Sequence, residues 1–274
     1  MAKKNRSRLA SLTLLEIAAG VAIGAVAVPA LAAHLPAKMP TKAPIAAVAS
    51  YNWTGFYLGA HAGYRWADAN FTSAAYTFDP GSGVVAFPAR NENYHPNGGI
   101  FGLQAGYNFM VAPKWLLGIE GDFSWGNGSD SKSAIATGVD AGGDGFVLTR
   151  NSEVKLTWQA TIRGRLGFVN GPWLLYGTGG VAFAHVKWSE SLVLNTLSPT
   201  TTTTAAWTAN KTLAGWVVGG GVEYMFNPNW IGRLEYLYED FGSFSVPHGF
   251  GPQTGDLDLT AQKVRLAISY KFNP

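Results

Sequence analysis

The chain has 274 residues, 14% of them charged, with a formal net charge of +3 and no cysteine. The absence of cysteine excludes a disulfide framework, and the small net charge gives no reason to expect a nucleic-acid partner. Charged residues fall well below the roughly 25% of an average soluble domain, whereas glycine (34 residues) and aromatic residues (13%) are abundant, as in strands that show one apolar face.

The N-terminal segment has the layout of a secretory signal peptide. Four basic residues come first: Lys3, Lys4, Arg6 and Arg8. A mostly small and apolar run follows, Leu9–Leu31, and Ala30-Leu31-Ala32 is a small-x-small cleavage pattern. We expect a signal peptide over residues 1–32, with Ala32 or Ala33 as the last residue removed. The alternative is an uncleaved anchor, which Glu16 disfavours because a carboxylate within the bilayer is costly.

Residues 33–50 are rich in proline, alanine and lysine and show neither a strand nor a helix period. This composition predicts a disordered, extended periplasmic tether without a packed core. The folded domain is then expected to cover residues 51–274.

From Trp53 onward, apolar and polar residues alternate with a period of two, which predicts strands with one apolar face. In the first segment, Phe56 and Leu58 share one face, and Tyr57 and Gly59 share the other. The alternation predicts eight strands, at residues 56–66, 101–109, 117–125, 158–168, 173–186, 216–226, 233–239 and 263–272. The fifth is ambiguous in phase, and its favoured apolar face contains Leu175, Val181 and Phe183.

The connections alternate between short and long. Short turns contain Ala112-Pro113-Lys114, Asn170-Gly171-Pro172 and Asn227-Pro228-Asn229, whose residue types favour tight turns. The other connections are expected to be long loops, at residues 67–97, 126–153, 187–210 and 242–259. Bacterial outer-membrane barrels show this alternation, with periplasmic turns and longer surface loops.

Two features favour a membrane barrel over a soluble barrel of the lipocalin type, in which the two faces are exchanged. The polar face carries many glycines and few of the lysines and glutamates typical of a solvated face. Aromatic residues gather beside the short turns, as at a membrane interface. They are Tyr107, Phe109, Trp115, Trp173, Phe226, Trp230, Tyr270 and Phe272.

Short motifs recur in a specific order along the chain. They are NWTGFYLG (52–59), RGRLG (163–167), LLYGTGG (174–180), GW (215–216), VEY (222–224), LEYLY (234–238), VRL (264–266) and YKF (270–272). Together they resemble a family of small alphaproteobacterial outer-membrane proteins that includes porin-like surface antigens and haem-binding surface proteins. The resemblance covers about residues 51–272 without the loops. It implies an all-β, eight-stranded antiparallel up-and-down transmembrane β-barrel, similar to the transmembrane domain of OmpA.

Many charged side chains are predicted to face the lumen. The acids are Glu120, Asp122, Glu223, Glu235 and Glu239, and the bases are Arg65, Arg163, Arg165, Arg233, Lys263 and Arg265. Opposite charges in a poorly hydrated interior must be paired, because an unpaired buried charge is costly. We favour a plug of ion pairs over a charged, solute-selecting eyelet, since side chains nearly fill an eight-stranded barrel. Arg163 and Arg165 are expected to pair with acids of the third, sixth and seventh strands.

No spacing of histidine with a nucleophile or an acid suggests catalysis, so we expect no enzyme. His61 is expected to face the lumen in a structural role. Tyr94, His95 and His248, placed in surface loops, could ligate haem iron, because members of the resembling family can bind it. We favour solvated loop residues instead, and we expect no resident cofactor or metal.

These observations predict an exported, integral protein of the bacterial outer membrane with a structural, envelope-supporting and surface-display role. The alternatives are a narrow porin for small solutes, or binding of haem or a host surface through the extracellular loops. Expected partners are outer-membrane lipids, lipopolysaccharide and the barrel-assembly machinery, with no nucleic acid. The oligomeric state stays open, a monomer included.

Overall fold

The computed structural model describes residues 51–81, 83–197 and 199–272, so the predicted signal peptide and tether lie outside the described residues. The eight long strands are β1 (Gly55–Ser73), β5 (Gly98–Ala112), β6 (Trp115–Val139), β7 (Gly145–Asn170), β8 (Trp173–Leu197), β9 (Thr200–Met225), β10 (Trp230–His248) and β11 (Gln253–Lys271). Three short strands join them: β2 (Tyr76–Phe78), β3 (Val85–Phe87) and β4 (Arg90–Tyr94). In this part of the chain, no helix is long and apolar enough to cross a membrane.

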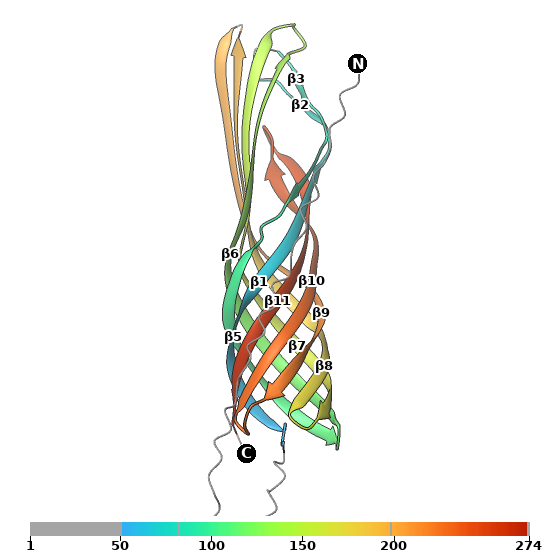
Figure 1. Ribbon diagram of the computed structural model, residues 1–274. Coiled ribbons are helices and arrows are strands. Elements are labelled where there is room, and N and C mark those ends of the chain that lie inside the picture. Colours follow the sequence, from blue (N-terminus) through green and yellow to red (C-terminus); the bar gives the residue numbers. More distant parts are fainter. Residues whose placement is uncertain (1–50, 82, 198, 273–274) are drawn as a thin grey trace, which may run out of the picture. The chain divides into compact units, whose positions relative to one another are not determined.

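The long strands form one closed antiparallel barrel (Figure 1). Each pairs with the long strands next to it in sequence, and β11 pairs back with β1 from Tyr57↔Lys271 to Thr72↔Asp256. Closure satisfies the backbone groups that an open sheet would leave at its two edges. The predicted all-β, eight-stranded up-and-down barrel is confirmed.

The apolar faces predicted from the alternation point outward. Leu103, Ile119 and Ile162 lie on this outer face and are each more than half exposed. Aromatic side chains mark both ends of the apolar band, for example Trp115 and Trp125 on β6. At about 3.3 Å per residue and a tilt of about 40°, the strand between these two tryptophans rises roughly 25 Å, the height of the apolar band of outer-membrane barrels.

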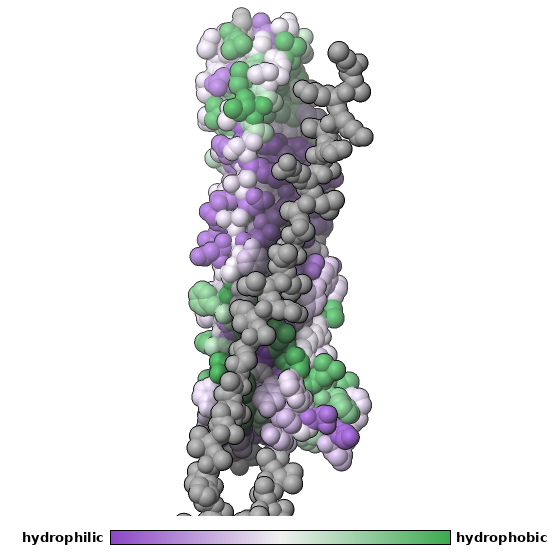
Figure 2. All heavy atoms as spheres, viewed as in Figure 1, coloured by the Kyte–Doolittle hydropathy of each residue, from purple (hydrophilic) through white to green (hydrophobic). Residues whose placement is uncertain are grey.

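Beyond this band all long strands except β5 continue, so the prediction of long loops was wrong at residues 126–153, 187–210 and 242–259. Between β1 and β5 a long connection remains, and it contains the short strands β2, β3 and β4. The hairpins β6–β7 and β8–β9 lie side by side and pair almost to their tips, as at Val139↔Gly145 and Phe146↔Thr196. We call this part the extension: residues 67–81, 83–97, 127–157, 186–197, 199–214 and 241–258. Along β7, the extension runs from Trp158, at the outer end of the barrel, to Gly145, a strand length of roughly 40 Å at about 3.3 Å per residue. Figure 2 shows hydrophilic side chains gathering on the surface of the extension next to the barrel.

The apolar residues change face where the barrel passes into the extension. On β8, Val181 faces outward in the barrel, whereas Val186, Trp188 and Leu192 face inward farther along the same strand. The physical reason is the change of solvent outside the strand from lipid to water. The alternation of apolar residues on the outer face therefore ends where the barrel passes into the extension, although the strand continues.

The interior is layered. Beside the short turns lies an apolar layer that includes Trp53, Leu116 and Leu174. A second apolar cluster, with Leu237 and Trp188 among its members, runs from the upper barrel into the extension. Charged side chains fill the barrel interior with these apolar clusters on either side.

Candidate functional site

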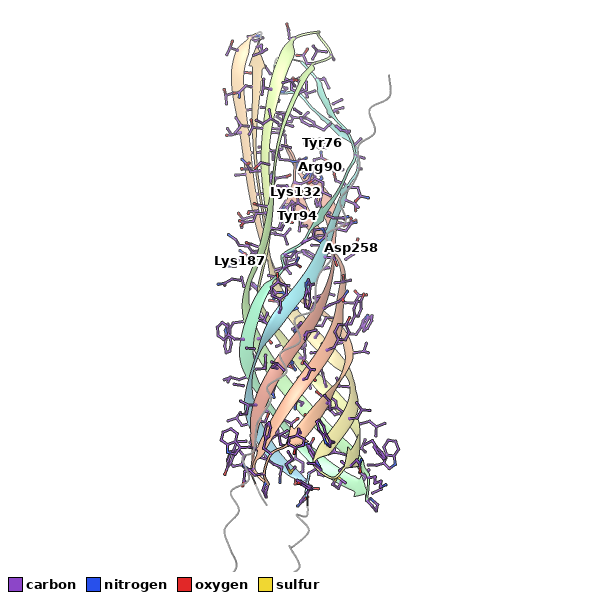
Figure 3. All side chains as sticks on the ribbon, viewed as in Figure 1. Tyr76, Arg90, Tyr94, Lys132, Lys187 and Asp258 are labelled. Carbon is purple, nitrogen blue, oxygen red and sulfur yellow. The ribbon has the colours of Figure 1, made fainter. Side chains whose placement is uncertain are left out.

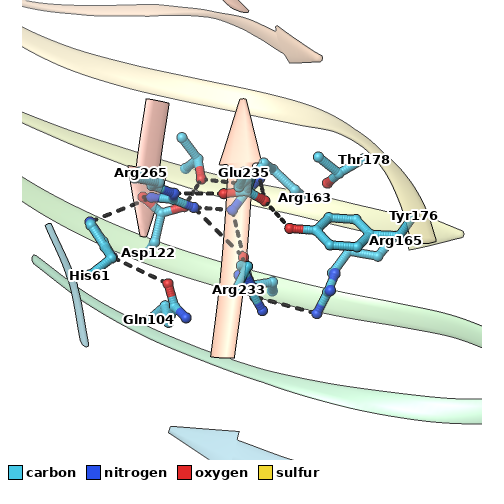
Figure 4. Close-up of polar contacts among 12 residues, drawn as sticks. His61, Gln104, Asp122, Arg163, Arg165, Tyr176, Thr178, Arg233, Glu235 and Arg265 are labelled. Atoms are coloured by element: carbon cyan, nitrogen blue, oxygen red, sulfur yellow. Dashed lines mark hydrogen bonds and ion pairs between the residues drawn. The ribbon is translucent and has the colours of Figure 1, made fainter. Parts of the chain in front are cut away.

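Four guanidinium groups and four carboxylates meet inside the barrel. Figure 4 shows the four guanidinium groups with two of the carboxylates, Asp122 and Glu235. We call the guanidinium groups and carboxylates together the central ion layer: Glu120 and Asp122 from β6, Arg163 and Arg165 from β7, Glu223 from β9, Arg233 and Glu235 from β10, and Arg265 from β11. Every one of them is at most 6% exposed. All are candidate residues from the sequence, and the structure brings them together.

Strand register accounts for part of this layer. Three acid–base pairs are direct cross-strand partners: Glu120↔Arg163, Glu223↔Arg233 and Glu235↔Arg265. Side chains directly opposite each other on one face of an antiparallel pair lie close enough to interact. Because these residues point inward and the register places them opposite each other, each acid lies beside a base of the neighbouring strand.

Arg163 is bound by acids from two other strands. Its Nη2 lies 2.5 Å from Glu120 Oε1 and 2.9 Å from Asp122 Oδ2, and its Nη1 lies 2.9 Å from Glu235 Oε1. Arg265 contacts the same three acids, with Nε 2.6 Å from Glu235 Oε2, Nη1 3.0 Å from Asp122 Oδ1 and Nη2 3.8 Å from Glu120 Oε1. Each carboxylate is therefore shared between guanidinium groups.

Two tyrosines complete the layer toward the short turns. Tyr57 donates a 2.6 Å hydrogen bond to Glu120 Oε2 and accepts one of 2.7 Å from Arg165 Nη1. Arg165 also pairs with Glu223, and its guanidinium lies 4.0 Å from the ring centroid of Tyr176. The layer thus combines equal numbers of opposite charges with hydroxyl donors, which is the condition for burying ions at acceptable cost.

A second polar group surrounds Arg65, apart from the central ion layer. Arg65 donates to Gln159 Oε1 at 3.2 Å and to the Leu156 carbonyl at 2.9 Å. Gln159 in turn donates to Glu239, whose other oxygen lies 2.6 Å from Lys263 Nζ. These contacts link four strands, β1, β7, β10 and β11, so Arg65 belongs to the network in the barrel but not to its central layer.

His61 lies inside the barrel, as its phase predicted. Its Nδ1 is 3.2 Å from Gln104 Oε1 and its Nε2 is 2.9 Å from Ser124 Oγ. Gln104 continues the chain of contacts to Ser269 on β11. Arg265 Nη1 also lies 3.4 Å from Nε2. Both ring nitrogens therefore have partners inside the barrel, as a structural role requires.

Comparison with known proteins identifies the family. A model of the family described as outer membrane protein beta-barrel domain matches residues 19–272. The chain belongs to this family. It is 32% identical over 247 residues to the 31 kDa outer-membrane immunogenic protein of Brucella melitensis biotype 1, covering 89% of this chain and 93% of that protein. It is 29% identical over 221 residues to the 22 kDa outer membrane protein of Rhizobium leguminosarum bv. viciae, covering 81% and 79%.

Among solved structures, outer membrane protein OprG from Pseudomonas aeruginosa is 12% identical, covers 81% of this chain and 97% of its own, and gives a TM-score of 0.43. The family and its relatives confirm the resemblance inferred from the motifs. They also confirm that this outer-membrane β-barrel protein is an integral protein of the outer membrane.

The three residues considered for haem do not share a site. Tyr94 and His248 belong to strands and are buried, which corrects their placement in loops, whereas the His95 side chain is exposed and lies 2.8 Å from Asp68. The Tyr94 hydroxyl is 2.8 Å from Glu92 Oε2 and 2.7 Å from Ser152 Oγ, and His248 packs against Phe71. Within the described residues, no group of three or more histidine, aspartate or glutamate side chains could hold a metal ion.

The sequence reasoning missed a second, partly buried ion cluster, which lies in the extension. Arg90 Nη1 is 2.7 Å from Glu190 Oε1, Arg90 Nη2 is 3.1 Å from Glu92 Oε2, and Arg150 also pairs with Glu92. We call these four residues the extension cluster. Alternation of Arg90, Glu92 and Tyr94 was a signal for it, because a strand with this phase directs all three to one side.

The electrostatics of the extension cluster follow from burial and pairing. Burial alone would raise the pKa of Glu92, but the hydrogen bond and charge of Arg90 outweigh burial and hold this pKa below its usual value. Burial raises the pKa of the Tyr94 phenol, which therefore stays a hydrogen-bond donor. Glu92 is therefore a carboxylate beside Arg90 at neutral pH, and the Tyr94 phenol donates a hydrogen bond to it.

Proposed function

We propose that this outer-membrane β-barrel protein is a closed structural barrel that supports the envelope and holds a rigid β-extension at the cell surface. The observation that carries the proposal is the central ion layer. Its guanidinium groups and carboxylates neutralise one another and leave no side chain of that layer more than 6% exposed. A solute crossing this layer would have to separate buried ion pairs, at a large desolvation cost.

The apolar clusters on either side support the same proposal. On the side of the short turns, Trp53 is fully buried and its Nε1 donates to the Gly171 carbonyl at 3.2 Å. On the side of the extension, Leu237 and Trp188 are also fully buried. A hydrated ion would have to enter both clusters, where mostly apolar side chains would replace its water.

The experiment is single-channel conductance of the folded, purified protein in a planar bilayer. We expect no discrete openings under conditions in which a bacterial porin, measured as a positive control, conducts. Folding is checked beforehand by the change in gel mobility on heating. Steady openings would contradict a closed barrel and favour the alternative of a narrow porin, with Arg163, Arg165 and Glu223 as candidates for its charge selectivity.

A further inference from the structure

A cavity of about 210 Å³ lies inside the extension. One wall comes from the inner face of the hairpin strands and the other from the segment containing β2, β3 and β4. The wall residues are Ala134, Ala136, Leu148 and Leu192 on one side and Tyr76, Phe87 and Pro88 on the other. Arg90 and Arg150 are the charged residues of the lining. The cavity is therefore mostly apolar, with two guanidinium groups of the extension cluster beside it.

Arg90 of β4 and Ala134 of β6 line the cavity from two strands, and we place its opening between them. β4 pairs with β1, and this part of β6 pairs with β7, so no backbone ladder joins β4 to β6 in the described chain. Two hydrogen bonds bound the opening: the His95 amide to Asp130 Oδ2 at 2.8 Å, and the Ala141 amide to the Val84 carbonyl at 2.9 Å. Ala134 lies between these contacts and is exposed.

The labelled side chains of Figure 3 show how this side of the extension is lined. Tyr76, Arg90, Lys132 and Tyr94 follow one another along it, toward the barrel. Lys132 Nζ lies 5.2 Å from the ring centroid of Tyr94, so it brings a further cation next to the extension cluster. Small residues at the opening and cations within give a route by which a small anion could reach the guanidinium groups.

In the extension cluster the carboxylate oxygens all have hydrogen-bond donors, whereas two guanidinium N–H groups lack an acceptor among the described residues. Both oxygens of Glu92 are bound, by Arg150 and by Arg90 with Tyr94, and both oxygens of Glu190 are bound, by Arg90 and by the Gly249 amide. The Nε–H groups of Arg90 and Arg150 are buried and have no hydrogen-bond acceptor among the described residues. An acceptor supplied by a ligand would satisfy these donors.

We propose that this cavity binds a small amphiphilic anion of the aromatic monocarboxylate class. Its carboxylate would accept hydrogen bonds from Arg90 and Arg150, because guanidinium–carboxylate bonds are charge-assisted and directional. Its ring would lie between Phe87 on one wall and Leu148 and Leu192 on the other. A cavity of about 150 Å³ already holds a benzene molecule, so this one accommodates a single substituted ring. The proposal is independent of whether the barrel conducts.

The test is a ligand-observed NMR titration of phenylacetate against the full-length protein folded in lipid nanodiscs, with empty nanodiscs as the blank. Phenylacetamide has the same shape without the charge. We expect saturable binding of phenylacetate, and weaker binding of phenylacetamide by about tenfold or more, as for the loss of one charge-assisted hydrogen bond. Equal binding of the two compounds, or phenylacetate signals no larger than those of empty nanodiscs, would overturn the proposal.

Three variants locate the site. Ala136→Phe fills the cavity and leaves all four residues of the extension cluster in the chain, and Arg150→Gln removes one guanidinium. Each should weaken phenylacetate binding about tenfold or more. The matched control is Ile135→Ala, next to Ala136 on the outer face of β6, where the side chain is 74% exposed. Binding should be unchanged in this control. Full binding by folded Ala136→Phe would place the ligand elsewhere and refute the assignment.

Discussion

Replacing Arg163 by leucine tests whether the central ion layer stabilises the barrel. The substitution removes the partner of three carboxylates, those of Glu120, Asp122 and Glu235. Breaking a buried ion pair by deleting one partner costs about 3–5 kcal/mol. Each of the three acids keeps another guanidinium partner, Arg233 or Arg265, which argues for the lower end, about 3 kcal/mol.

The assay is equilibrium urea unfolding in lipid vesicles, followed by tryptophan fluorescence, together with the unfolding temperature in detergent. Both the free energy of unfolding and this temperature should fall. The matched control is Lys155→Leu, which breaks the exposed 2.9 Å pair with Glu153 in the extension and should cost less than about 1 kcal/mol. An unchanged unfolding temperature in Arg163→Leu would refute the stabilising role.

A double variant separates charge balance from packing. Arg163→Leu combined with Glu235→Leu removes one positive and one negative charge, so the remaining layer is again balanced. We expect the double variant to lose less stability than the sum of the losses in the two single variants. Each single substitution leaves an opposite charge without its partner, whereas the double substitution removes both charges. Strict additivity would show that unpaired charge is not the cause.

Two further predictions concern close packing and acidity. A Cβ atom on Gly180 would lie 2.1 Å from the Ile162 carbonyl oxygen, whereas one on Gly164 would meet nothing closer than the Gly179 oxygen at 3.9 Å. Gly180→Ala should therefore lower the free energy of unfolding in urea by about 1–3 kcal/mol, and Gly164→Ala should change it little. Equal losses in the two variants would contradict the packing argument. Burial lowers the pKa of His248, with the charge of Glu190 opposing, so its contribution to stability is present above the ordinary histidine pKa of about 6.5 and is lost as the pH falls below it. Amide exchange, corrected for intrinsic rates, should show the β10–β11 hairpin loosening between pH 7.5 and 5 in the native protein but not in His248→Phe; the same response in both would exclude this histidine.

The barrel strands could be predicted because each repeats one simple pattern. In the segment 117–125, Leu117 and Ile119 alternate with Gly118 and Glu120. The outer face of this segment meets lipid and the inner face meets the side chains of the barrel interior, so the alternation continues along the whole segment. The interior position of the charged residues follows from the same phase. Which acid meets which guanidinium could not be predicted, because it depends on the stagger between strands, and no pattern within one strand contains that information.

The extension could not be recognised as long strands from a single apolar face. Val186, Trp188, Leu192 and Leu194 on β8 keep the period of two, but their apolar face is opposite to that of Val181. A search for alternation that allows one change of face would find such strands. The prediction also placed His248 in a loop. Its burial depends on a contact with Phe71 from the far end of β1, which no pattern within β10 shows.

The seam between β1 and β11 has a consequence for biogenesis. Its pairs, such as Tyr57↔Lys271, join the first and the last strand of the described barrel, so β11 must be made before the ring can close. Until then any partial sheet exposes two unpaired edges, which hydrocarbon does not tolerate. The polypeptide must therefore cross the periplasm unclosed and complete its circle as it enters the bilayer, a non-local and intrinsically slow step.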